Sequence, residues 1–392
     1  MNDFSYLKLG YDTPSFAGFA NQHRASTWLN DEAIPFWGRA GLDKTYGGFI
    51  ESMDLSGAPS GTGFKRTRVT ARQIYVFCQS GFLGIPSAFE IAEHGVQFLL
   101  RHHKSETKGA WYRSVTADGK PLDQTDDLYD LAFVLFALAW WHRVSGDHRI
   151  VEMAKDTLDH IHDALKHPSG AGFIHAADGH SHFQQNPHMH LLEALVELFE
   201  STRDERFLDE ATCIYQLFKA HFLVNGSLRE YFGPGWNQAE GIDGRKVEPG
   251  HMSEWAWLLA RYGRVAQVDV SGIVIELMKF VRQSKQLNAK GLLMDIVLDD
   301  GQPFKTDTRL WPQTEMLKGL IALSELTGEN VNEELEECMD AIFENFIYPA
   351  PQGCWIDHRS SDGKVIVDKI PASSLYHIML GFCEYRRAAL GN

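Results

Sequence analysis

The chain lacks both an excess of positive charge and any long apolar run. Its 392 residues include 37 Lys and Arg against 52 Asp and Glu, which gives a formal net charge of −15 at pH 7. Nucleic-acid binding needs clustered cations that displace phosphate counterions, so this balance argues against nucleic acid and acidic membrane surfaces as partners. No apolar run approaches the roughly 20 residues of a membrane-spanning helix. We therefore expect neither a nucleic-acid nor a membrane partner.

Cysteine is also scarce, and the first residues carry no export signal. The opening stretch, MNDFSYLKLGYD, has no basic region followed by an apolar one. Four of the five cysteines fall in segments with helical periodicity, and their spacing indicates no pairing, as is typical of free buried thiols in a reducing compartment. The sequence thus predicts a soluble, cytoplasmic protein. The cysteines are Cys78, Cys213, Cys338, Cys354 and Cys383.

What the chain does have is a short tract that recurs six times. Each copy is a glycine, one or two large apolar residues and, in most copies, a turn such as Asp-Gly a few residues later. The copies lie about 60 residues apart, and most of the intervals between them read as two amphipathic helices. Such a period predicts a repeat architecture. The copies begin at Gly47, Gly109, Gly172, Gly226, Gly291 and Gly353.

The two helices of a repeat differ in the distribution of their apolar residues. Segment 126–145 is apolar around almost its whole circumference, whereas segment 147–166 carries its charges on one face. The first pattern is typical of an inner helix and the second of an outer one. The sequence therefore predicts an all-α fold, an (α/α)6 barrel of six inner and six outer helices, in one domain spanning 1–392. Short β-hairpins and long loops are expected at one end. The expected helices are 21–38, 71–84, 86–103, 126–145, 147–166, 187–202, 204–222, 252–264, 270–285, 313–327, 331–347 and 373–389.

In a closed ring, the starts of the inner helices face one central cavity, and several of these starts carry chemically capable residues. The most informative is EPGHMSEW, residues 248–255. Pro249 and Gly250 predict a tight turn before the helix, and His251 follows in its first turn. Glu254 lies three residues further on the same face, where it can accept a hydrogen bond from the imidazole and fix its tautomer, as an acid/base histidine requires. The alternative is a histidine at a helix N-terminus beside a glutamate favoured by the helix dipole.

Other inner-helix starts add a cation and further polar groups. Arg72 interrupts the apolar run ARQIYVF, so its planar, permanent charge suits sugar hydroxyls or an oxyanion; a surface position is the alternative. Asn186 and His190 are four residues apart and share a helix face. His188 and His190 form a His-x-His pair, but no third ligand stands at suitable spacing, so no metal site is predicted.

The last two starts complete the candidate constellation. Trp311 and Glu315 offer a stacking ring and a carboxylate, which suit the apolar face and the hydroxyls of a sugar. His377 lies one turn into the last helix; alone it would read as a core histidine. In the second repeat, Asp126 and Asp127 are explained by helix capping and are not assigned a catalytic role.

Five motifs together resemble one known family. YDLAF, NPHMHLLEA, EPGHMSEW, LWPQTE and SLYHI occur in this order and resemble the N-acylglucosamine 2-epimerase superfamily, most closely its mannose isomerase and sulfoquinovose isomerase branch. The resemblance spans essentially the whole chain. It implies the same (α/α)6 barrel and the interconversion of reducing monosaccharides at C1 and C2 without metal, nicotinamide or other cofactor. It leaves a monomer and a homodimer equally open.

The resemblance also assigns roles to residues. It implies that His251 and His377 are the catalytic histidines. One position departs from the pattern, because relatives often carry a tryptophan four residues before the arginine, where this chain has Arg68. This leaves the sugar-stacking arrangement open. The substrate-binding residues implied by the resemblance are Arg72, Asn186, His190, Glu254, Trp311 and Glu315.

The expected activity is therefore isomerisation of D-mannose to D-fructose, with D-lyxose as a second substrate, through a cis-enediol. A sugar 2-epimerase is the first alternative, and a sulfoquinovose isomerase, for which Arg66 or Arg68 would supply an additional cation, is another. A glycoside hydrolase would use two carboxylates, Glu254 and Glu315, but would leave the histidines without a role. A non-catalytic binding protein would not need two histidines at the barrel mouth.

Overall fold

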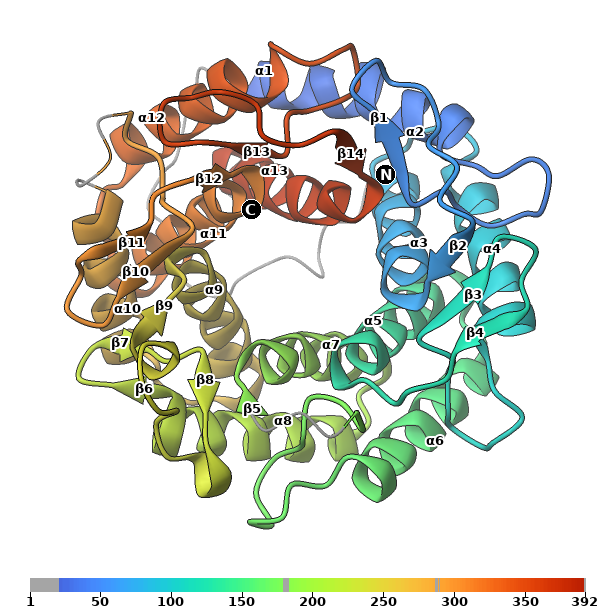
Figure 1. The fold of residues 1–392 in the computed structure, drawn as a ribbon, viewed down its shortest axis with the longest axis horizontal. Coiled ribbons are helices and arrows are strands. Elements are labelled where there is room, and N and C mark those ends of the chain that lie inside the picture. Colours follow the sequence, from blue (N-terminus) through green and yellow to red (C-terminus); the bar gives the residue numbers. More distant parts are fainter. Residues whose placement is uncertain (1–20, 179–182, 286–287, 289, 391–392) are drawn as a thin grey trace.

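The helices form a closed ring of two concentric layers around a central axis (Figure 1). The computed structural model describes residues 21–178, 183–285, 288 and 290–390. Residues 1–20, for which the sequence predicts no export signal, lie outside the described residues. The two layers confirm the predicted (α/α)6 barrel. In the described part of the chain, the inner layer consists of α3 (Thr67–Phe82), α5 (Leu128–Ser145), α7 (Asn186–Thr202), α9 (Pro249–Ala266), α11 (Leu310–Thr327) and α13 (Leu375–Ala389).

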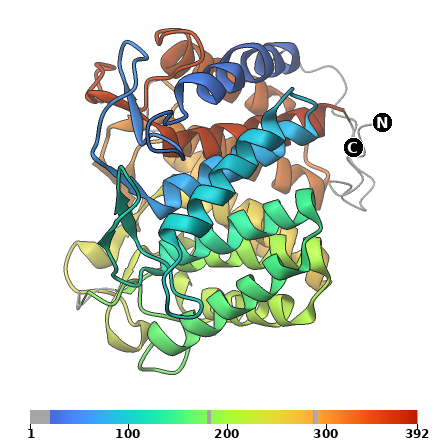
Figure 2. The same ribbon diagram turned by 90° about the vertical axis from the view of Figure 1, so that its right-hand side faces the viewer.

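The outer layer alternates with the inner one along the chain. Several outer helices end in, or contain, a π-helical turn, at Trp28–Ala33, Leu99–His103, Phe218–Phe222 and Phe343–Ile347. In Figure 2, helices of both layers run between the two ends of the barrel. The outer helices are α1 (Gln22–Thr27) with α2 (Ile34–Ala40), α4 (Ala88–Phe98), α6 (His148–Ala164), α8 (Glu205–Leu217), α10 (Ser271–Lys285) and α12 (Asn332–Ile342).

The pair α5 and α6 shows why the apolar pattern sorts helices into layers. Every residue of α5 from Asp130 to Trp140 is buried, as expected of a helix surrounded by others. Helix α6 buries Ile150, Ala154 and Leu158, which recur every four residues on a single face. Asp127 caps α5 by accepting a hydrogen bond from the backbone N–H of Asp130, as its sequence position predicts.

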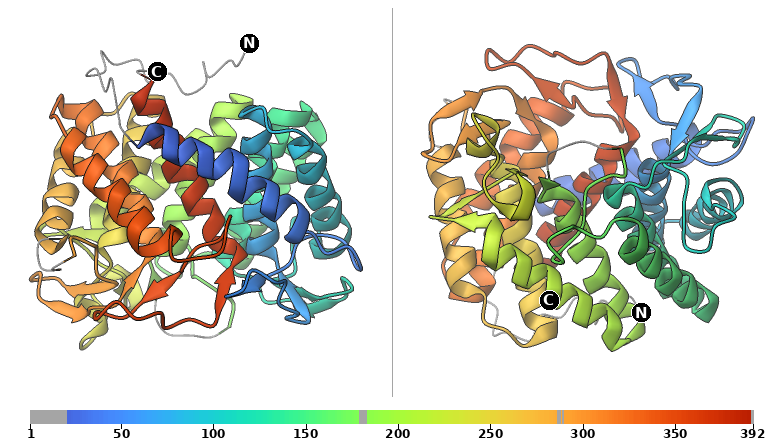
Figure 3. Two further views of the ribbon diagram at one scale, coloured as in Figure 1. Left: turned by 90° about the horizontal axis from the view of Figure 1, so that it is seen from above. Right: turned by 60° about the horizontal axis from the view of Figure 1, so that its bottom comes forward.

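Short strands gather at one end of the barrel, where the inner helices begin (Figure 3). They form antiparallel ladders of two or three strands, in the orders β2-β3-β4, β11-β10-β9, β1-β14, β5-β8, β6-β7 and β12-β13. The strands are β1 (Ser52–Asp54), β2 (Phe64–Arg66), β3 (Ser114–Thr116), β4 (Pro121–Asp123), β5 (Phe183–Gln184), β6 (Leu223–Val224), β7 (Ser227–Leu228), β8 (Tyr231–Phe232), β9 (Lys246–Val247), β10 (Ile296–Leu298), β11 (Pro303–Lys305), β12 (Thr308–Arg309), β13 (His358–Arg359) and β14 (Lys369–Pro371).

The first and last repeats join to close the ring. Strand β1 pairs with β14, with Ser52 opposite Pro371. The backbone N–H of Ala372 donates to the carbonyl of Glu51 at 3.0 Å, and the Gln73 side chain donates to the carbonyl of Ala372 at 2.7 Å. Helix α13 therefore packs beside α3, and the inner-helix starts of all repeats surround the same axis.

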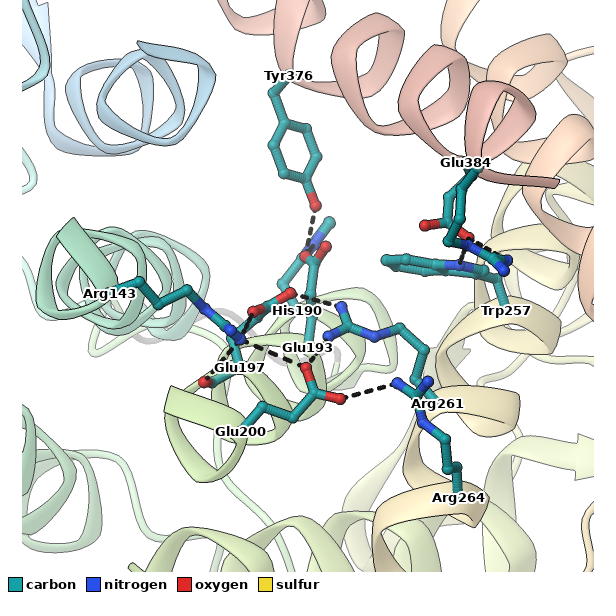
Figure 4. A network of polar contacts seen from close by, with 11 residues as sticks. Arg143, His190, Glu193, Glu197, Glu200, Trp257, Arg261, Arg264, Tyr376 and Glu384 are labelled. Atoms are coloured by element: carbon teal, nitrogen blue, oxygen red, sulfur yellow. Dashed lines mark hydrogen bonds and ion pairs between the residues drawn. The ribbon is translucent and has the colours of Figure 1, made fainter. Parts of the chain in front are cut away.

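The C-terminal ends of the inner helices carry a network of buried charges (Figure 4). Glu197 of α7 accepts hydrogen bonds from Arg143 of α5 and from Arg261 of α9, both at 2.5 Å. Glu200 accepts from Arg264 at 2.9 Å and also from Arg261. Because each carboxylate contacts more than one guanidinium, the charges at this end compensate one another and tie three inner helices together.

No helix in the described ranges is long and apolar enough to cross a membrane. All five cysteines are free, as predicted, but Cys213 on outer helix α8 is exposed, so the expectation of uniformly buried thiols is wrong at this position.

The tract glycines share one backbone conformation, which explains the repeat. All six have a positive φ, between 65° and 82°. At Gly109 the surroundings add a second constraint, because a Cβ there would lie 2.1 Å from the carbonyl oxygen of Asp156 on α6. At Gly109 the tract is therefore a turn that packs against the outer helix that follows it in the chain, and only glycine meets both demands.

We expect Gly109→Ala to destabilise the protein more than Gly146→Ala. Gly146 ends α5 with a φ of 63° but has no atom within 4 Å of its Cβ position. Alanine at Gly146 should cost only the left-handed backbone, about 1–2 kcal/mol. At Gly109 the contact with Asp156 adds to that cost. Thermal unfolding of the two variants tests this, and equal losses of melting temperature would contradict it.

Candidate active site

The starts of α9, α11 and α13 bring two histidines against one tryptophan. The ring centroid of His251 lies 5.0 Å from that of Trp311, and the ring centroid of His377 lies 5.5 Å from it. The two imidazole centroids are thus separated by no more than the sum of these distances. Both histidines are buried, with exposed fractions of 6% and 7%. Residues far apart in sequence therefore meet at the strand end of the barrel.

His251 is held by a glutamate that precedes its helix. Its Nδ1 lies 2.9 Å from Oε2 of Glu230, and Glu230 also accepts from the Gln185 side chain at 2.8 Å and from the backbone N–H of Glu248 at 3.2 Å. Burial lowers the pKa of His251, but the carboxylates of Glu230, Glu248 and Glu254 outweigh it and raise that pKa to about 9. At neutral pH the His251 side chain is therefore an imidazolium.

The predicted hydrogen bond from His251 to Glu254 is wrong. Pro249 and Gly250 also form the first turn of α9 rather than a turn before it. Helical side chains lean toward the N-terminus, so His251 meets Glu230 in the segment before α9. Glu254, one turn further in and fully buried, lies with Oε1 3.9 Å from Nδ1 of His190 on α7.

His377 has the opposite protonation state. Its Nδ1 lies 2.7 Å from Oε1 of Glu315 on α11. Burial, followed by the charges of Arg72 and Lys318, lowers the pKa of His377 well below its ordinary value. The imidazole is therefore neutral, with Nδ1–H donating to Glu315 and a lone pair left on Nε2. The site thus pairs a cationic imidazole with a neutral one.

Arg72 lies among aromatic rings and has no carboxylate partner among the described residues. Its guanidinium carbon lies 4.2 Å from the ring centroid of Phe133 and 4.9 Å from that of Tyr376. Nη2 donates to the hydroxyl of Tyr129 at 2.5 Å, while Nε is buried without an acceptor. A buried cation without an anion is unfavourable unless a ligand supplies negative charge or hydrogen-bond acceptors.

A cavity of about 550 Å³ adjoins Arg72, within the size range of small-molecule sites. Asn186, at the start of α7, lines it, and its Oδ1 is buried with no hydrogen-bond partner among the described residues. This oxygen is available to a donor on a ligand. The lining residues are Arg66, Arg68, Arg72, Arg113, Asp127, Tyr129, His175, Asp178, Gln184, Asn186, Pro187 and Ser373.

His190 extends the site toward the barrel axis. Its Nδ1 lies 3.1 Å from Oε2 of Glu193, which also accepts from the hydroxyl of Tyr376 at 2.5 Å (Figure 4). The ring of His190 packs against Phe133, with centroids 4.7 Å apart. Because Phe133 also contacts the guanidinium of Arg72, His190 and Arg72 belong to one site.

Several of these residues were missed by sequence analysis. Glu230 lies in the fourth glycine tract, between Arg229 and Tyr231, where the sequence gives no sign that it is buried. Tyr129, Glu193 and Tyr376 lie inside motifs that were recognised, but they were given no role there. Their polar atoms become significant only when the helices are placed side by side.

The carboxylates and imidazoles of the site are the ligand types that metal ions bind, but a lysine side chain already pairs with one of the carboxylates. Both ring nitrogens of His188 are hydrogen-bonded to backbone groups, of Gln184 and Phe173, so His188 has no free nitrogen with which to bind a metal ion beside His190. Glu254, Glu315 and His377 offer ligand atoms within 4.8 Å of one another. The ammonium of Lys318 lies 2.5 Å from Oε2 of Glu315, where it provides the positive charge that a metal would bring.

A second donor cluster lies further out, at β12 and β13. Asp295, Asp307 and His358 also bring ligand atoms within 4.8 Å of one another. Asp295 already pairs with Lys305 at 2.9 Å and with Arg309 at 2.8 Å. Its carboxylate is therefore compensated by the protein.

Comparison with known proteins identifies the family and agrees with the fold. The family model of N-acylglucosamine 2-epimerase (GlcNAc 2-epimerase) matches residues 48–381. The chain belongs to this family. It is 32% identical over 370 residues to a mannose-6-phosphate isomerase of Rhizobium meliloti (strain 1021), covering 91% of this chain and 94% of that protein.

Solved structures share the fold. The cellobiose 2-epimerase of Spirochaeta thermophila DSM 6192 superimposes with a TM-score of 0.82 at 23% identity, covering 94% of this chain and 96% of the other. A D-mannose isomerase gives a TM-score of 0.82 at 20% identity, covering 92% and 97%. Family membership makes this protein an enzyme of the sugar isomerase and epimerase class, with a small sugar as substrate.

Proposed function

We propose that this protein is a metal-independent aldose–ketose isomerase that interconverts D-mannose and D-fructose, with D-lyxose as a second substrate, and that the ring is one catalytic domain. The observation that carries the proposal is the pair of imidazoles against Trp311, one cationic and one neutral. An acid and a base that both pack against one aromatic ring suit proton transfer beside a sugar carbonyl.

Ring opening is the task of His251. As an imidazolium it donates the proton on Nε2 to the ring oxygen while the C1–O5 bond breaks and C1=O1 forms. It then takes the proton of the anomeric hydroxyl and returns to its cationic form. Glu230 holds Nδ1 at 2.9 Å throughout, so the ring keeps its orientation while Nε2 exchanges protons.

Isomerisation is the task of His377. Its Nε2 takes the proton from C2, and the electron pair forms C1=C2 while the carbonyl electrons move to O1. The proton of the C2 hydroxyl passes to O1 of this cis-enediolate. His377 then returns its proton to C1, and C2=O2 forms as the ketose carbonyl. Arg72 and His190, which both contact Phe133, stabilise the negative charge on O1 and O2.

A neutral sugar suits the cavity better than a sulfonated or phosphorylated one. Of the arginines that line the cavity, Arg66 pairs with Glu51 at 2.7 Å, and Arg113 pairs with Asp127 at 3.2 Å. Arg68 lies 3.7 Å from Asp130. Their charges are thus compensated by the protein, and only Arg72 remains for the substrate.

A sugar 2-epimerase is the second candidate, because His251 provides another ionisable group beside Trp311. An epimerase would return the proton to the opposite face of C2, where a second imidazole could deliver it. The two outcomes differ in the carbon that receives the proton.

The test is incubation with EDTA in D2O together with D-mannose, D-lyxose, mannose 6-phosphate or cellobiose, followed by NMR. Ketose formation from mannose with deuterium at C1 supports the isomerase. A C2-inverted aldose supports the epimerase, and faster turnover of mannose 6-phosphate would overturn the choice of a neutral sugar. Absence of turnover for every sugar would refute the proposed function, and loss of activity in EDTA would refute metal independence.

Glu230→Gln should move the alkaline limit of activity to lower pH. Catalysis needs protonated His251, whose pKa of about 9 depends on the Glu230 carboxylate, so activity is lost as pH rises through that value. Without this charge the limit should fall by roughly one to three pH units. The pH dependence of kcat measures it.

The matched control is Glu210→Gln. Glu210 lies 2.9 Å from Nε2 of His162 on the outer layer and raises the pKa of that histidine in the same way. The control should leave the pH dependence of kcat unchanged. An unshifted alkaline limit in Glu230→Gln would show that His251 is not the acid.

A further inference from the structure

A fully buried lysine, Lys318, contacts the glutamate that holds His377. Lys318 is three residues after Glu315 on α11, and both have exposed fractions of 0%. Its Nζ lies 2.5 Å from Oε2 of Glu315 and 4.0 Å from the ring centroid of Trp257. The Trp257 indole donates to Glu384 at 3.2 Å, which anchors this ring to the charge network at the far end of the barrel (Figure 4).

The surroundings of Lys318 are acidic. Glu193, Glu254 and Glu315 are all fully buried, and all three carboxylates act electrostatically on Lys318. Ionised carboxylates away from water are unfavourable unless a counter-charge is near. Lys318 supplies this charge.

The two oxygens of Glu315 have different partners. Oε2 lies against the ammonium of Lys318, whereas Oε1 lies 2.7 Å from Nδ1 of His377. The carboxylate thus bridges the ammonium and the imidazole. Burial and the neighbouring Glu254 raise the pKa of Glu315 well above its usual value, and Lys318 is the cation that opposes this shift. If Glu315 carried a proton, it would be a weaker acceptor for Nδ1–H, and the histidine tautomer with a free Nε2 would lose its support.

We propose that Lys318 is a positioning residue of the reaction: its ammonium keeps Glu315 ionised, so that Glu315 holds His377 in the tautomer whose Nε2 accepts the substrate proton. The inference rests on the proposed function. Lys318 touches no reacting atom: it acts through its contact with Glu315, and its charge also helps to lower the pKa of His377.

Every element packed around His377 contributes charged or titratable groups to this balance. They are Arg72 on α3, His190 and Glu193 on α7, His251 and Glu254 on α9, Glu315 and Lys318 on α11, and Tyr376 on α13. Among them Lys318 is the group in direct contact with Glu315 on the side away from His377.

Lys318→Met tests the inference, because methionine fills similar volume without charge. We expect kcat to fall by roughly 10- to 100-fold, the range for groups that orient metal-bound imidazoles, with KM nearly unchanged. The acidic limit of kcat should move to higher pH, since both Glu315 and His377 then lose their protons less readily. Lys155→Met, which removes a lysine paired with Asp204 on the outer surface, is the control and should change neither quantity.

The double variant Lys318→Met with Glu315→Gln separates positioning from a general structural role. It removes both members of the Glu315–Lys318 ion pair together, so Glu315 is not left as a carboxylate that has lost its ammonium, and we expect it to be more stable than Lys318→Met. If Lys318 acts through Glu315, the double variant should have the kcat of Glu315→Gln alone. A further tenfold loss would overturn the inference, as would an unshifted acidic limit in Lys318→Met. An inactive wild-type protein would instead refute the proposed function.

Discussion

His377→Asn should lower kcat by roughly two to four orders of magnitude, the contribution typical of a general base. Asparagine is the informative replacement because its amide can still donate to Oε1 of Glu315, as Nδ1–H of His377 does at 2.7 Å. Only the base at Nε2 is lost. The fold should therefore persist while the transfer of the C2 proton stops.

The measurement is exchange of the C2 proton of D-mannose with D2O, followed by NMR together with ketose formation. A single-base isomerase should lose both exchange and product formation in both directions. A two-base epimerase should keep exchange from one of the two epimers, because His251 remains. His162→Asn, on the outer helix α6, is the control and should be as active as wild type. Turnover of His377→Asn within fivefold of wild type would refute the role of His377.

The layers of the barrel were predictable because they depend on local periodicity. Helices 126–145 and 147–166 were predicted almost to their observed ends, since one is apolar all round and the other on one face. The starts of other inner helices were predicted too late: α9 begins at Pro249 and α11 at Leu310, whereas 252 and 313 were expected. Their first turns carry the polar residues of the site, which break the apolar period.

The π-helical turns were not predicted from the sequence. Segments 86–103, 204–222 and 331–347 were predicted as continuous helices, and their extents agree with the structure. Their last five residues are π-helical. So few residues do not distinguish one helical period from another.

The partners of the site residues were only partly predictable. Register along the chain placed His251, Trp311, Glu315 and His377 at successive helix starts, and these residues do meet. Which carboxylate is hydrogen-bonded to which histidine depends on how separate repeats pack against one another. Glu230 is twenty-one residues from His251 and reaches it through a loop, so helical spacing favoured Glu254 in error.

Arg72→Met should lower kcat/KM by roughly 10²- to 10³-fold, as loss of one oxyanion donor does elsewhere. The guanidinium has no carboxylate partner among the described residues, its Nε has no acceptor, and it lines the cavity. Its charge is therefore available to a developing oxyanion. Arg72→Lys keeps the charge but loses the planar fork, so it should lie between wild type and Arg72→Met.

The same features predict that Arg72→Met is at least as thermally stable as wild type although it is less active. A buried cation without an anion raises the free energy of the empty protein, and methionine removes this cost while still packing against Phe133 and Tyr376. The melting temperature should thus be equal to or above that of wild type, while kcat/KM falls. If Arg72 were structural, both quantities would fall together, and Arg72→Met with wild-type kcat/KM would remove Arg72 from the mechanism. The divergence of stability from activity is what distinguishes a charge placed for the transition state from one placed for the fold.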